Sequence, residues 1–168
     1  MAKIIRDITA VLLGSYPQGT DGTVQPIEWE VLKQEGNKAL LISKNDLTQR
    51  RFDEDSNAWA DSEIRHWLNN EFLNAAFTEA DKTAILETEL PDVGTTDKVF
   101  LLSSEEAETL YKGLGAKWWL RSPGRPEYEA AFVRGLYGIV FELGFYVFKK
   151  FGVRPALWVN LDSDIFKS

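Results

Sequence analysis

Apolar and polar residues alternate with a period of two near the start of the chain. Ile27, Trp29 and Val31 are separated by Glu28 and Glu30, and this spacing predicts a strand with one buried face. The turn sequence Glu-Gly-Asn at 35–37 and a second apolar run at 39–43 follow directly. Together these features predict a β-hairpin over residues 26–45.

The period lengthens to three or four residues over 60–77, which predicts a helix. Asp61 or Ser62 precedes the periodic run and is expected to cap it. The predicted buried face, with Trp67 beside it, consists of Ile64, Leu68, Phe72 and Ala75.

Two shorter helices are predicted after it, because each begins with the spacing of a capping box. Thr78 and Asp81 open the first, and Ser103 and Glu106 open the second, which we expect to stop at Gly113. The apolar run at 97–103 between them predicts a strand.

The helical pattern disappears after residue 113, where glycines punctuate short apolar runs and the last of these, 154–161, predicts a final strand. No linker rich in Pro, Ser or Gly divides the chain, and no internal repeat is visible. We therefore expect one α+β domain over residues 1–168: a hairpin, then helices, then an irregular β-rich half.

Residues 135–152 carry more large apolar side chains than one buried strand face can hold. Ile139, Phe141 and Leu143 share one face of a straight strand, but Gly144 breaks the phase, and Phe145 and Tyr146 then compete for the same side. One interpretation is a core-forming β-meander. The other is an exposed recognition surface, because exposed apolar clusters mark binding sites. The pattern leaves both open.

Composition excludes several classes of partner, of covalent chemistry and of cellular location. The formal net charge of −7 argues against nucleic acid, which requires a basic patch. No cysteine is present, which excludes disulfides, thiolate metal sites and lipid attachment through Cys. The sequence shows neither a signal-peptide pattern nor an apolar run long enough for a membrane span. We expect a soluble protein that is cytoplasmic or virion-associated.

Catalytic and metal-binding patterns are weak. The single histidine, His66, has only Glu63 and Asn70 as weak candidate partners at helical metal-ligand spacing. Asp53, Asp55 and Asn57 alternate as in a calcium loop but lack its downstream glycine and bidentate glutamate. We therefore predict no catalytic residue, no metal site and no cofactor.

The C-terminal motifs "WWLRSPG", "AAFV" and "GVRPALWV" resemble the ending of variable proteins from diversity-generating retroelements. The upstream motifs "GSYPQ", "PIEWEVL", "GNKALLIS", "IRHWLNNEFLNAAF" and "DKVFLLS" are similar to a bacterial and phage domain family of uncharacterised function that often carries this ending. The resemblance implies a C-type lectin fold, of the subtype shared with formylglycine-generating enzymes.

The resemblance also implies a function. In that family a reverse transcriptase misreads adenines in a template repeat, and the mutated copy replaces the variable region, here residues 118–157. Template Asn codons then become codons for many residue types, but never for Glu, Lys, Gln, Met or Trp. This implies a hypervariable, receptor-type ligand-binding protein whose ligand is another protein's surface. The ligand-binding side chains implied are Arg125, Pro126, Tyr128, Arg134, Leu136, Tyr137, Ile139, Phe141, Leu143, Phe145, Tyr146, Phe148 and Phe151.

The remaining residues of this region divide into two groups. Five are unreachable from Asn codons, namely Glu127, Glu129, Glu142, Lys149 and Lys150. The implied scaffold consists of Trp118, Trp119, Leu120, Ala131, Val133, Val140, Val147, Val153, Ala156 and Leu157, with Arg121 and Arg154 in structural hydrogen bonds and Gly124, Gly138, Gly144 and Gly152 at turns.

Two alternatives accompany this interpretation. One is a structural or virion protein of the same fold without diversification. The other is an enzyme of the formylglycine-generating type, which the absence of cysteine disfavours because that activity in relatives depends on cysteines that bind copper. Calcium-dependent sugar binding is disfavoured too, because the region lacks a suitable cluster of oxygen ligands. The name of a lectin fold does not by itself imply carbohydrate binding.

Overall fold

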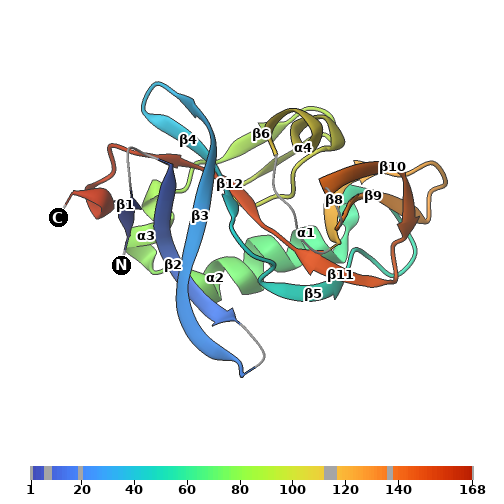
Figure 1. The fold of residues 1–168 in the computed structure, drawn as a ribbon, viewed down its shortest axis with the longest axis horizontal. Helices are drawn as coiled ribbons and strands as arrows, with labels where there is room; N and C mark the ends of the chain where they lie inside the picture. Colours follow the sequence, from blue (N-terminus) through green and yellow to red (C-terminus); the bar gives the residue numbers. More distant parts are fainter. Residues whose placement is uncertain (1, 6–8, 19–20, 112–116, 136–137, 168) are drawn as a thin grey trace.

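The computed structural model describes residues 2–5, 9–18, 21–111, 117–135 and 138–167. Two five-stranded sheets form the body, in the orders β1-β2-β3-β4-β12 and β10-β9-β8-β11-β5, with a small β6-β7 ribbon between helices (Figure 1). The chain is therefore α+β, as the sequence pattern predicts.

The first sheet is built on the predicted hairpin. Its strands are β1 (Lys3–Ile5), β2 (Ala10–Gln18), β3 (Thr23–Glu35), β4 (Lys38–Ser43) and β12 (Ala156–Asn160), and all neighbours are antiparallel. The hairpin turn falls between Glu35 and Lys38, as expected. The last strand, β12, returns to this sheet and pairs with β4, so the C-terminal strand lies beside the N-terminal hairpin (Figure 1).

The predicted long helix is interrupted by a π-helical turn. A 3-10 turn (Trp59–Asp61) precedes α1 (Glu63–Trp67), then come the π turn (Leu68–Phe72) and α2 (Leu73–Ala76). Ser62 is the N-cap, and its hydroxyl accepts a hydrogen bond from the Arg65 N–H. A π turn holds one residue more than an α turn. The buried face therefore ends on Ala76, and the prediction that Ala75 is buried was wrong.

Both predicted capping boxes are present. They open α3 (Glu79–Ala84) and α4 (Ser104–Leu110). The predicted stop at Gly113 lies outside the described residues. Residues 97–103 do not form the predicted strand: β7 (Thr95–Asp97) pairs with β6 (Thr88–Leu90), and the buried run that follows makes a single bridge, from Phe100 to Ala156. Burial without a neighbouring strand explains the apolar pattern.

The second sheet contains most of the C-terminal half. Its strands are β5 (Thr48–Arg51), β8 (Trp118–Pro123), β9 (Glu129–Arg134), β10 (Ile139–Tyr146) and β11 (Lys150–Val153). Strand β11 runs parallel to β8, which it meets at Gly152 and Trp118, and antiparallel to β5. Strand β10 is at the edge of the described sheet and pairs with β9. A final 3-10 turn covers Asp164–Phe166.

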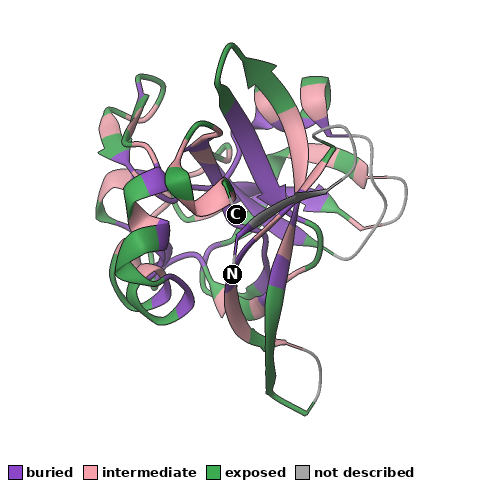
Figure 2. Cartoon of the chain, turned by 90° about the vertical axis from the view of Figure 1, so that its left-hand side faces the viewer, coloured by how far each residue is buried: buried purple, intermediate pink, exposed green. Residues whose placement is uncertain are grey.

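A single apolar core joins the two sheets and the helices, and its residues lie along the strands through the middle of the molecule (Figure 2). Nine of the ten predicted scaffold side chains are buried, and the tenth, Val140, is half-buried. Arg154 is buried, donates to the carbonyls of Ser43 and Lys44, and also bonds the Tyr111 hydroxyl. These contacts are the structural hydrogen bonds expected of a buried arginine.

Gly144 and Gly152 lie inside strands instead of the predicted turns, whereas Gly124 lies in the connection between β8 and β9. Gly152 is inside β11, where a Cβ atom would meet the Asp46 carboxylate. Gly124 lies where a Cβ atom would be 2.7 Å from the carbonyl oxygens of Glu129 and Leu143. Lack of space, rather than turn geometry, accounts for both glycines.

Candidate ligand-binding surface

Six large apolar side chains are exposed together in the C-terminal half. They lie on β10, on the turn that follows it and on the connection between β8 and β9, at Tyr128, Ile139, Leu143, Phe145, Tyr146 and Phe148. We call this set the aromatic surface. Large exposed apolar groups so close in sequence are characteristic of recognition sites.

The aromatic rings of this surface contact one another. The Tyr146 ring stacks on the Phe148 ring at 5.4 Å with an interplanar angle of 6°, and on the Tyr128 ring at 6.1 Å. The Phe145 ring is 5.1 Å from Tyr146 and also reaches the Phe151 ring at 5.6 Å. The surface is thus a continuous array of rings whose inner end rests on the core.

A bulge in β10 shifts the register of the strand just before Phe145 and Tyr146. Between the pairs Phe141–Phe132 and Phe145–Ala130, β10 advances four residues while β9 advances two. Gly144 occupies this bulge with φ +93°, and a Cβ atom there would be 2.8 Å from the Ala130 carbonyl oxygen. Only glycine fits such a conformation and such an approach.

The exposed fractions separate the thirteen residues that the sequence assigned to ligand binding. Eight are exposed: Arg125, Tyr128, Arg134, Ile139, Leu143, Phe145, Tyr146 and Phe148. Pro126 and Phe141 are half-buried, and the Phe141 ring packs on Phe132 at 5.4 Å. Leu136 and Tyr137 lie outside the described residues.

Phe151 does not belong to the exposed set, so its assignment to ligand binding requires correction. Its side chain is 9% exposed, and its ring stacks on Trp119 at 4.5 Å and contacts Phe132 at 5.1 Å. The residue lies on β11, which is inside the sheet between β8 and β5. The Phe151 ring is thus part of the core, whereas Phe141 on the edge strand β10 is only half-buried against it.

Two basic side chains, Arg134 and Lys149, lie beside rings at the edge of the aromatic surface. Residues 117–151 contain six basic and three acidic residues, a net charge of +3 within a chain whose net charge is −7. The Arg134 guanidinium lies 6.0 Å from the Phe141 ring, and the Lys149 ammonium lies 5.8 Å from the Phe148 ring. These distances are within reach of cation–π attraction. The aromatic surface therefore has a cationic rim.

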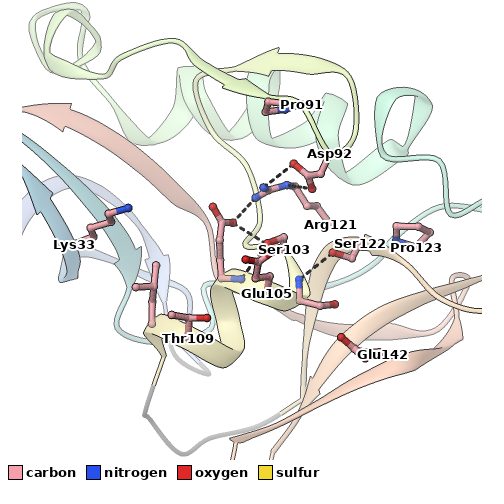
Figure 3. A pocket seen from close by; sticks show the side chains of 13 residues that line it. Lys33, Pro91, Asp92, Ser103, Glu105, Thr109, Arg121, Ser122, Pro123 and Glu142 are labelled. Carbon is pink, nitrogen blue, oxygen red and sulfur yellow. Dashed lines mark hydrogen bonds and ion pairs between the residues drawn. The ribbon is translucent and has the colours of Figure 1, made fainter.

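A second feature, which the sequence did not indicate as a site, is a pocket of about 770 Å³ beside α4 (Figure 3). The buried Arg121 guanidinium forms part of its wall, where it donates to both Asp92 carboxylate oxygens at 3.0 Å, to Glu106 Oε1 at 2.6 Å and to the Leu101 carbonyl at 2.8 Å. The capping-box spacing of Ser103 and Glu106 signals only the start of α4, although the same Glu106 oxygen that caps this helix also holds Arg121.

The residues considered for metal binding have other roles. Asp53 is buried, and its carboxylate accepts hydrogen bonds from the N–H groups of Asp55, Ser56 and Glu63. His66 is exposed on α1. Within the described ranges, no three His, Asp or Glu side chains are grouped as a metal site requires. None of the described helices has the length and apolar composition to cross a membrane.

Comparison with protein-family models gives a match to part of the chain. Residues 36–115 match a family model described as a domain of unknown function, DUF6273. No curated protein and no solved structure matches the chain. The matched segment runs from the turn before β4 to the residues after α4, so it ends before β8 and excludes the whole aromatic surface.

Proposed function

We propose that this protein binds ligands through the aromatic surface and acts by binding rather than by catalysis. The observation that carries this proposal is the exposure of six large apolar side chains on the edge strand β10, the turn after it and the β8–β9 connection. Leaving such groups in water is unfavourable by roughly 25 cal/mol per Å² of apolar area. A partner that covers them recovers this free energy.

We further propose that a retroelement diversifies this surface. Support comes from the separation of side chains in the segment 118–157. The residues implied as scaffold face the core, whereas eight of those implied as variable face solvent. Diversification requires this separation, because random substitution of exposed residues usually changes stability by less than about 0.5 kcal/mol. Random substitution of the core would prevent folding.

The proposed fold is the C-type lectin fold of the formylglycine-generating-enzyme subtype. Two antiparallel-rich sheets with few helices, and a last strand that returns to the N-terminal hairpin, are compatible with it. In this proposal the buried faces of both sheets and the helices are the scaffold, and β10 with the β8–β9 and β10–β11 connections displays most of the binding residues.

The proposed ligand is a protein surface. Tyr and Phe side chains supply large contact areas for little loss of side-chain entropy, and Arg is frequent among energetically dominant interface residues. The cationic rim favours a partner that presents apolar residues bordered by Asp or Glu.

The test is a displayed library. The codons of the six exposed apolar residues are randomised together, and in a control library the codons of six core residues of similar size are randomised: Trp118, Trp119, Leu120, Phe132, Val147 and Phe151. We expect most clones of the first library to display folded protein, and selection against an unrelated protein such as lysozyme to yield binders. Equal loss of folded display in both libraries, or no binders from a folded library, would refute the proposal.

A further inference from the structure

The pocket beside α4 is separate from the aromatic surface. It lies between α4, the end of β8, the residues 91–92 and β10, and none of the six exposed apolar side chains lines it. Figure 3 shows Asp92 and Arg121 on one side of it and Glu142, from β10, on the opposite side. A ligand of this pocket would therefore be independent of the proposed function.

Neither basic residue of the pocket is available to an anion. Four hydrogen bonds already occupy the Arg121 guanidinium, whose side chain is 5% exposed. The Lys33 ammonium lies 2.9 Å from Glu35, and this hydrogen bond and charge raise the pKa of Lys33. The Arg121 charge is therefore compensated by two carboxylates, and Lys33, whose side chain is 48% exposed, is paired with Glu35.

Carboxylates exceed cations around the pocket. Asp92, Glu105, Glu106 and Glu142 face Arg121 and Lys33, which leaves a net charge of −2. Glu105 and Glu142 are exposed, and within the part of the chain that the structure describes neither has an ion-pair partner. A concave site lined by one sign of charge concentrates ions of the opposite sign.

A nearly buried hydroxyl points to a ligand as well. Ser104 is 8% exposed and lines the pocket, and its N–H donates to the Ser122 hydroxyl at 2.9 Å. Among the described residues its own hydroxyl has no hydrogen-bond partner, although every fully shielded side-chain oxygen or nitrogen has one. The Ser104 hydroxyl must therefore open to the pocket, where it can accept a hydrogen bond. Most buried polar groups have such a partner.

We propose that this pocket binds a cationic group, an ammonium or a guanidinium, on a short aliphatic stem. The cation is held by Glu105, Glu142 and the Ser104 hydroxyl, and the stem lies against the apolar wall, which includes Pro91, Leu110 and Pro123. Such a group occurs on free alkylamines and on the Lys or Arg side chains of proteins. The chemistry recognised is the same in both.

The experiment is a titration of the full chain, labelled with ¹⁵N, monitored by NMR. The probes are n-butylammonium and n-butylguanidinium, with n-butanol and butyrate as neutral and anionic controls. Blocked Gly-Lys-Gly and Gly-Arg-Gly peptides are titrated in the same way. Tighter binding of a peptide than of the free amine would identify a Lys or Arg side chain of a protein as the natural ligand. We expect shifts confined to the amides around Ser104, Ser122 and Glu142.

A charge-neutral variant tests the assignment. In Glu105→Gln/Glu142→Gln we expect about fivefold weaker binding of the cationic probes, since each exposed carboxylate contributes modestly. The matched control is Glu108→Gln/Glu127→Gln, which removes the same charge from exposed positions outside the pocket and should bind like the unchanged protein. Circular dichroism melts verify that both variants fold.

Several results would overturn the proposal. Equal shifts with butanol would mean an apolar crevice without charge recognition. Stronger shifts with butyrate would mean an anion site at Lys33 or Arg121. Unchanged affinity in the Glu105/Glu142 variant, or no shift with either cationic probe at 50 mM, would mean that the carboxylates do not form a binding site.

Discussion

Phe148 and Phe151 are three residues apart and provide the sharpest test of the exposed and buried assignments. Phe148 is 51% exposed and Phe151 is 9% exposed. Replacing each by alanine removes the same atoms, so a difference in the free energy of unfolding reports the environment alone.

The expected magnitudes follow from the contacts. Phe151 stacks on Trp119 at 4.5 Å and contacts Phe132 and Phe145, so Phe151→Ala leaves a cavity in the core and should cost about 3–5 kcal/mol. About half of the Phe148 surface is already in water. Losing roughly 50 Å² of buried area at about 25 cal/mol per Å², partly offset by side-chain entropy, makes Phe148→Ala cost about 1 kcal/mol or less.

Urea denaturation of both variants, followed by tryptophan fluorescence and circular dichroism, measures these costs. The two should differ by at least about 2 kcal/mol. A similar large loss for both would mean that Phe148 is part of the core. A similar small loss for both would mean that Phe151 is exposed and that the packing described for β11 is wrong.

Three further predictions concern the scaffold. Trp119→Ala should cost about 3–5 kcal/mol in urea denaturation, and a stable, well-folded variant would contradict its place in the core. Gly144→Ala should lower the melting temperature far more than Gly22→Ala, because both glycines have positive φ but only Gly144 lies against backbone; equal effects would contradict the bulge. Burial raises the pKa of Asp46 in the folded protein despite the opposing charge of Arg154. The folded state therefore favours the protonated carboxyl, and this stabilisation is lost as the pH rises from the ordinary carboxyl pKa through the raised one. Asp46→Asn should therefore gain stability relative to the unchanged protein between pH 3 and pH 7, and a relative loss would contradict this sign.

The elements of regular period could be predicted from sequence, and the irregular ones could not. Alternation located the hairpin, and side-chain capping signals located the starts of the helices at Ser62, Thr78 and Ser103. The π turn could not be predicted, because the pattern fits an α period until Ala75 and the difference is a single residue. Residues 97–103 resembled a strand because a buried, extended segment needs the same apolar side chains.

The composition of the candidate site could be predicted from the sequence, but the position of each side chain in it could not. Its apolar excess was visible in the sequence, since no single strand face could hold it. The place of each ring depended on sheet order, which brings Phe151 into an interior strand and leaves β10 at the edge. The pocket beside α4 was invisible, because Asp92, Glu106 and Arg121 are far apart in sequence and meet only through tertiary packing.

The most direct test of the central claim is to sequence the DNA that flanks the coding region. A diversified binding protein requires a reverse transcriptase gene nearby and a near-copy of the segment that encodes residues 118–157. We predict that the near-copy differs from the gene at template adenines, in codons for exposed residues such as Tyr128, Phe145, Tyr146 and Phe148, and agrees with it at Trp119 and Phe151. The absence of any near-copy, or mismatches concentrated in the codons of buried residues, would contradict the account.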